Sequence, residues 1–171
     1  APPPNYVREM VDLLGDTSSQ HSIHRPLYGA SRRESNCPWW NAGLEQDPFD
    51  NDTIYYGSQF VFKSKERGLS GEVISDDLTT NNKDWQTFKE SGGITSDVTA
   101  AENYTSITTI ATSPLKQGVL WVGTDDGRVH VTQDGGKSWK SIENKARKIP
   151  DNSWVPHIEP SLYDAGSAFI V

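Results

Sequence analysis

Carboxylates on predicted loops are the residues of this sequence best suited to acid and base chemistry. Two carboxylates that flank a glycosidic bond, about 5–10 Å apart, can hydrolyse it, one as the acid and the other as the base or nucleophile. Asp125-Asp126-Gly127, however, is more typical of a hairpin turn, because Asp-Gly supplies the positive φ values of a tight turn. The other carboxylates are more simply explained as solvated side chains on loops. We therefore predict no catalytic residue among Asp76, Asp77, Asp97, Glu102, Asp125 and Asp126.

Histidines and cysteine are the residues that could hold a metal ion. His21 and His24 are three residues apart, but their segment has no helical pattern to bring the rings together. No nearby Asp or Cys completes a ligand set, and His130 and His157 lie far along the chain. The single cysteine, Cys37, excludes an internal disulfide and is predicted to be a free structural thiol. We therefore predict neither a metal site nor a cofactor.

Side chains in and beside the irregular regions are the better candidates for ligand contacts. Exposed aromatic rings can stack on sugars or grip a peptide, and binding residues are often carried by loops. The alternative, which we favour, is that these rings cover the edges of a sheet. The candidate ligand-binding residues are Trp39, Trp40, Trp85, Asp97 and Tyr104.

The composition is that of an acidic globular protein. The 171 residues include 16 basic and 23 acidic side chains, for a net charge of −7. This balance argues against binding to nucleic-acid backbones or acidic membranes. No run of about 18 apolar residues is present, so we predict no membrane span.

Short strands must position these side chains, because the pattern from residue 44 onward is all-β. Apolar runs at 53–58 and 59–64 form one predicted hairpin, and 119–124 with 128–132 form a second. Each hairpin is followed by a further short strand, at 72–75 and 140–142. Residues 1–43 instead read as an irregular N-terminal segment with a short helix-like pattern at 7–14.

An internal repeat decides the predicted fold. Asp47-Pro48, Ser113-Pro114 and Glu159-Pro160 occupy equivalent places, each preceding an apolar strand. Pro114 and Pro160 are 46 residues apart, which suits one four-stranded propeller blade of about 40–50 residues. Pro48 and Pro114 are 66 apart, which implies an insertion at about 76–103. The expected inner strands of the later blades are 104–112 and 154–159.

The sharpest local motif is Thr132-Gln133-Asp134-Gly135-Gly136-Lys137-Ser138-Trp139. Its Asp can accept bonds from backbone N–H groups of its own turn, and Gly136 can take a positive φ. Its Trp buries a large ring beneath the hairpin. The motif therefore predicts a structural staple built from Thr132, Asp134, Gly136, Ser138 and Trp139.

A degenerate copy of this motif begins 68 residues upstream, at Ser64. Glu66 replaces the Asp and Gly71 replaces the Trp, whereas Gly68 and Ser70 keep their places. A longer carboxylate is less suited to the tight turn, and the missing ring removes packing, so we expect a looser blade.

These segments resemble the secreted bacterial Asp-box (BNR-like) β-propellers related to the sortilin-type (VPS10) domain, which are often grouped with glycosyl hydrolases. The resemblance is carried by residues 52–64, 92–105, 113–139 and 153–166. It implies an all-β fold, a partial β-propeller of about two four-stranded blades plus the start of a third, over residues 44–171. It also implies a secreted, periplasmic or cell-surface location.

The predicted function is a non-catalytic binding or scaffold module within a larger propeller, with a protein or glycan as ligand. The alternative is part of a glycoside hydrolase-like propeller enzyme acting on glycans, and a third hypothesis is an assembly factor for a membrane protein complex. Sialidase activity is disfavoured, because His24-Arg25-Pro26 lacks the residue between Arg and Pro found in sialidases. A propeller closes with at least about four blades, so we expect further blades or other chains to complete the ring.

Overall fold

The computed structural model describes residues 42–86, 104–143, 150 and 152–171. The predicted helix-like segment at 7–14, Cys37, Trp39, Trp40 and Asp97 lie outside these residues. None of the described helices is long and apolar enough to cross a membrane.

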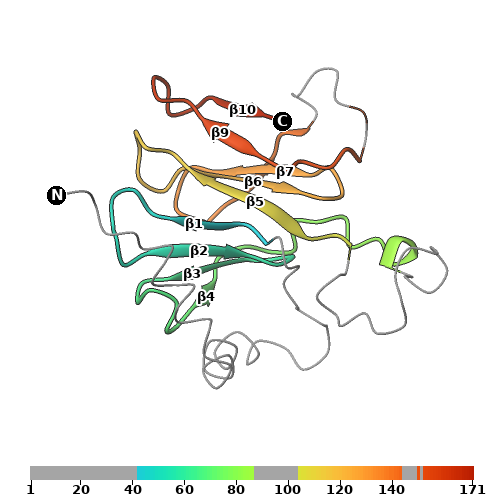
Figure 1. Ribbon diagram of the computed structural model, residues 1–171, viewed down its shortest axis with the longest axis horizontal. Helices are drawn as coiled ribbons and strands as arrows, with labels where there is room; N and C mark the ends of the chain where they lie inside the picture. The colour runs from blue at the N-terminus through green and yellow to red at the C-terminus, as the bar shows by residue number, and fades with distance from the viewer. Residues whose placement is uncertain (1–41, 87–103, 144–149, 151) are drawn as a thin grey trace.

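Antiparallel sheets make up the fold, as the sequence predicts, and the chain is an all-β partial propeller (Figure 1). Blade 1 has the order β1-β2-β3-β4, with strands Leu44–Gln46, Ile54–Gly57, Val61–Ser64 and Glu72–Val73. Blade 2 has the order β5-β6-β7-β8, with strands Ile107–Thr112, Leu120–Thr124, Val129–Thr132 and Lys140–Ser141. The third, partial blade pairs β9 with β10, which span Ile158–Pro160 and Ala168–Ile170.

Blade 2 lies between the other two sheets and is packed on both faces (Figure 1). Side chains therefore alternate along β6 between two hydrophobic clusters, and all five of its residues are buried. Leu120 and Val122 face blade 1, whereas Trp121 faces the partial blade. The cluster toward blade 1 contains Tyr55, Val61, Leu78, Ile107, Ile110, Leu120 and Val122. The second cluster contains Ala111, Val119, Trp121, Val129, Val155 and Ile158.

The third repeat is offset by two residues from the predicted alignment. In blade 2, Thr112 on the first strand pairs with Leu120 on the second. In the partial blade, Pro160 pairs with Ala168 in the same way, so Pro160 is equivalent to Thr112. Ser161-Leu162, and not Glu159-Pro160, therefore occupies the place of Ser113-Pro114. Proline has no N–H group and cannot donate a backbone hydrogen bond. It fits within β9 because β9 is the first strand of its sheet, and the free edge of such a strand does not need that donor.

The predicted insertion begins with a segment anchored to blade 2. Leu78 is buried in the first cluster, and Thr80 donates hydrogen bonds to Asp126 Oδ2 from both its backbone N and its Oγ1, each at 2.7 Å. A short 3₁₀ helix, η1, follows at Lys83–Gln86. It contains the backbone of the predicted ligand-binding residue Trp85. This start of the insertion is therefore part of the packed structure.

Candidate functional site

The 132–139 turn uses its polar groups on itself. Ser138 donates from its backbone N to Asp134 Oδ1 at 2.9 Å and from its hydroxyl to Oδ2 at 2.6 Å. Thr132 Oγ1 donates to Asp134 Oδ1 at 2.8 Å and accepts from Gly136 N at 3.0 Å. The Ser138 bonds, and then the Thr132 bond, lower the pKa of Asp134 to about 2. Both carboxylate oxygens are thus engaged within the turn, which makes its role structural.

Trp139 extends this turn into the neighbouring blade. Its Nε1 donates to the backbone oxygen of Ile74 at 2.8 Å, and its ring packs against the cluster between blades 1 and 2. Gly136 approaches the same residue so closely that an added Cβ would lie 2.9 Å from the Ile74 oxygen. The sequence predicts only that Trp139 packs beneath its own hairpin. In the structure its ring also joins two blades.

The 64–71 turn keeps only part of this arrangement. Ser64 Oγ accepts from the backbone N of Glu66 at 3.2 Å and of Gly68 at 2.9 Å. Ser70 Oγ donates to Glu66 Oε2 at 2.8 Å, so the longer carboxylate still contacts the turn. Arg67 has a positive φ of 54°, where the intact turn has a glycine.

The Asp125-Asp126 pair lies in the β6–β7 hairpin turn, as predicted. Asp126 is completely buried, accepts a hydrogen bond from Thr124 Oγ1, and anchors Thr80. Gly127 supplies the positive φ, at 84°. Asp126 therefore holds the turn and the start of the insertion together.

Asp125 differs from its neighbour because one of its oxygens has no partner. Oδ1 accepts from Ser106 N at 2.7 Å, whereas the buried Oδ2 has no hydrogen-bond partner in the described part of the chain. Burial above all raises the pKa of Asp125 to about 7. The predicted ligand-binding residue Tyr104 lies beside it and donates to the Asp125 backbone oxygen at 3.0 Å. Asp125 can thus hold a proton near neutral pH.

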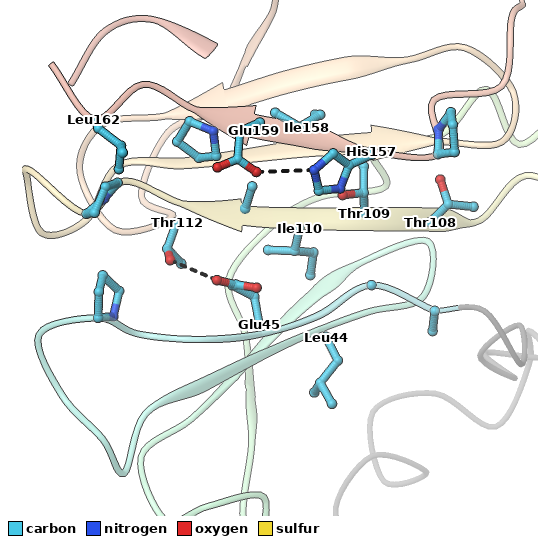
Figure 2. Close-up of a pocket in the computed structure, with 17 residues that line it drawn as sticks. Leu44, Glu45, Thr108, Thr109, Ile110, Thr112, His157, Ile158, Glu159 and Leu162 are labelled. Carbon is cyan, nitrogen blue, oxygen red and sulfur yellow. Dashed lines mark hydrogen bonds and ion pairs between the residues drawn. The ribbon is translucent and has the colours of Figure 1, made fainter. Parts of the chain in front are cut away.

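A groove of about 560 Å³ runs along the first strands of the three blades and is here called the inner-strand groove (Figure 2). β5 forms its floor, with β1 on one side and β9 on the other. It is lined by Ala42, Gly43, Leu44, Glu45, Pro48, residues 108–112, Pro114, residues 156–160 and Leu162.

The groove is lined by two carboxylates and one imidazole, those of Glu45, Glu159 and His157. Glu45 Oε1 accepts from Thr112 Oγ1 at 3.3 Å, and His157 Nε2 lies 3.2 Å from Glu159 Oε2 (Figure 2). Burial raises the pKa of Glu45, the Thr112 bond opposes this, and the charge of Glu159 adds to the rise. The charge of Glu159 therefore reaches Glu45 across the groove.

The hydroxyl of Thr109 on the groove floor has no hydrogen-bond partner among the described residues. Thr109 is 7% exposed and lines the groove (Figure 2). Its neighbour Thr108 instead donates to the backbone oxygen of Val155 at 2.8 Å. The groove thus combines a free hydroxyl with two carboxylates.

Glu45, Thr109 and Glu159 were not candidates on sequence grounds, and His157 was considered only as a metal ligand. The strand register shows why, since Glu45 pairs with Tyr55, Ala111 with Trp121 and Glu159 with Phe169. Glu45, Ala111 and Glu159 are therefore the same position in three successive repeats. This equivalence was the sequence signal that could have pointed to Glu45 and Glu159. The two-residue error in aligning the third repeat concealed it.

Comparison with known proteins gives a fold and not a family. No protein-family model matches the chain, and no curated protein sequence matches it. The crystal structure of an ancestral GH74 enzyme superposes with a TM-score of 0.52 and 15% identity, covering 80% of this chain but 14% of that one. A GH74 xyloglucanase from Xanthomonas campestris gives a TM-score of 0.45 and 17% identity, covering 68% of this chain and 16% of the other. GH74 enzymes are β-propeller glycoside hydrolases, so the likeness supports the propeller fold.

Proposed function

We propose that this chain is a non-catalytic, glycan-binding segment of a larger propeller, and that its ligand lies in the inner-strand groove. The observation that carries the proposal is the convergence of Glu45, Thr109 and Glu159 from three first strands on one groove. Carboxylates accept hydrogen bonds from sugar hydroxyls, and a threonine hydroxyl both donates and accepts. Side chains held on strands are positioned more firmly than side chains on loops.

The wider context of the proposal is a secreted Asp-box propeller of the BNR-like or sortilin type. The 132–139 turn supports it, because all five of its pattern residues take part in a turn that joins two blades. Exposed apolar side chains on the partial blade support further blades or chains beside it. Phe169 and Val171 are 73% and 70% exposed, and such apolar exposure favours a covering partner.

The test is calorimetric titration of the chain with neutral, soluble oligosaccharides. Thr109→Val removes the free hydroxyl and keeps the shape, so folding should be unaffected while glycan affinity falls about tenfold, the effect of one hydrogen bond. Thr79→Val is the matched control, since Thr79 bonds to Asp77 away from the groove. Equal affinities of the Thr109→Val variant and the unaltered chain would contradict a site in this groove.

Glycoside hydrolysis is the second candidate function, favoured by the raised pKa of Glu45 with a second carboxylate across the groove. Hydrolases use such a pair, one carboxyl as the acid and the other as the base or nucleophile. Release of reducing sugar, abolished by Glu159→Gln, would favour this function over binding alone.

A further inference from the structure

We propose that the inner-strand groove selects glycans that carry free, protonated amino groups, that is, cationic hexosamine oligomers. This inference rests on the proposed glycan-binding function and adds the chemical class of the sugar. The observation behind it is the charge of the lining: Glu45 and Glu159 line the groove, and no lysine or arginine is found among the described residues that line it.

The geometry places an ammonium group between complementary partners. Glu45 lies on one side of β5 and Glu159 on the other (Figure 2). At the same position of the repeat, β5 contributes only the methyl group of Ala111, which occupies little space. Thr109 adds a free hydroxyl on the floor. The ammonium group of an amino sugar would thus lie near the carboxylates, and its oxygen atoms would hydrogen-bond to the Thr109 hydroxyl.

Electrostatics favours a cation over a neutral sugar at this place. Glu45 is partly buried, and burial together with the charge of Glu159 raises its pKa. A bound cation offsets both effects, because a nearby opposite charge stabilises the ionised carboxylate. An ammonium group bound here would therefore favour the ionised form of Glu45. His157 Nε2 lies 3.2 Å from Glu159 Oε2 on the same side of the groove as Glu159.

The experiment compares fully deacetylated chitotriose, which is cationic, with its N-acetylated counterpart, which is neutral. Titrations are run at about pH 6, where an amine is largely protonated. We expect the cationic trimer to bind at least about tenfold more tightly and to lose affinity as salt is added.

Variants separate the groove from the general acidity of the chain, whose net charge is −7. Glu45→Gln and Glu159→Gln should each reduce the preference for the cationic trimer over the neutral trimer several-fold, because each removes a negative charge that attracts the ammonium group. Glu72→Gln is the matched control. It removes the same charge from an exposed position on β4, and the preference should not change. Near-ultraviolet circular dichroism checks that each variant is folded.

The outcomes distinguish the inference from the function on which it rests. Equal or tighter binding of the acetylated trimer would overturn the amine preference while leaving glycan binding intact. An equal loss of preference in Glu72→Gln would also overturn it, since the effect would then come from net charge. Failure of both trimers and of neutral glycans to bind would overturn the proposed function as well.

Discussion

Replacing Gly136 by alanine tests how the 132–139 turn joins two blades. Gly136 has a φ of 94°, and its added Cβ would lie 2.8 Å from Ile74 Cδ1 and 2.9 Å from the Ile74 backbone oxygen. A left-handed conformation costs a non-glycine residue about 1–2 kcal/mol. Overpacking adds about 1–3 kcal/mol, because β4 must move. We therefore expect Gly136→Ala to lower the free energy of unfolding by about 2–5 kcal/mol.

Gly135→Ala is the matched control for this prediction. Gly135 also has a positive φ, 74°, but nothing lies within 4 Å of its added Cβ. Gly135→Ala should lower the free energy of unfolding only by the conformational cost of a positive φ, about 1–2 kcal/mol. Arg67, at the same place in the 64–71 turn, shows that a side chain fits there. Urea unfolding followed by tryptophan fluorescence measures both values. Equal losses in the two variants would refute the reasoning that the turn is held against Ile74.

Two further predictions concern single side chains. Trp139→Phe should cost at least about 1 kcal/mol in urea unfolding, because the Nε1 bond to the Ile74 oxygen is lost; an unchanged midpoint would contradict this. Asp125 has a folded pKa raised to about 7, so its contribution to stability is fully present below its unfolded pKa of about 4 and is lost as the pH rises through the folded value. Urea midpoints measured across this interval should show that decline, and Asp125→Asn should remove it; an unchanged slope in the variant would argue against Asp125 as the titrating group.

Much of the fold follows from local sequence signals. Alternating apolar residues and turn residues are enough to locate the hairpins, because strand periodicity and turn conformation depend on neighbours a few residues away. The Asp125-Gly127 turn and the positive φ of Gly136 are of this kind. The predicted third inner strand, 154–159, was wrong at both ends, since β9 spans Ile158–Pro160. Proline is a weak guide to a strand end where no backbone donor is required.

The candidate groove could not be predicted in the same way. Glu45, Thr109 and Glu159 come from different blades and meet only because the blades stack with their first strands side by side. Burial of Asp125 and the bond from Trp139 to Ile74 likewise depend on segments distant in the sequence. Such contacts are set by packing between sheets, and a two-residue error in repeat alignment is enough to separate equivalent positions.

The sequence by itself determined the strands, the turns and the propeller repeat, because each is encoded by residues close together along the chain. Only the tertiary structure decided which side chains share a groove, which carboxylate loses contact with water, and which blade a tryptophan stabilises. The physical reason is that burial and electrostatic environment belong to the space between blades, where residues more than 60 positions apart, such as Ile74 and Trp139, come into contact.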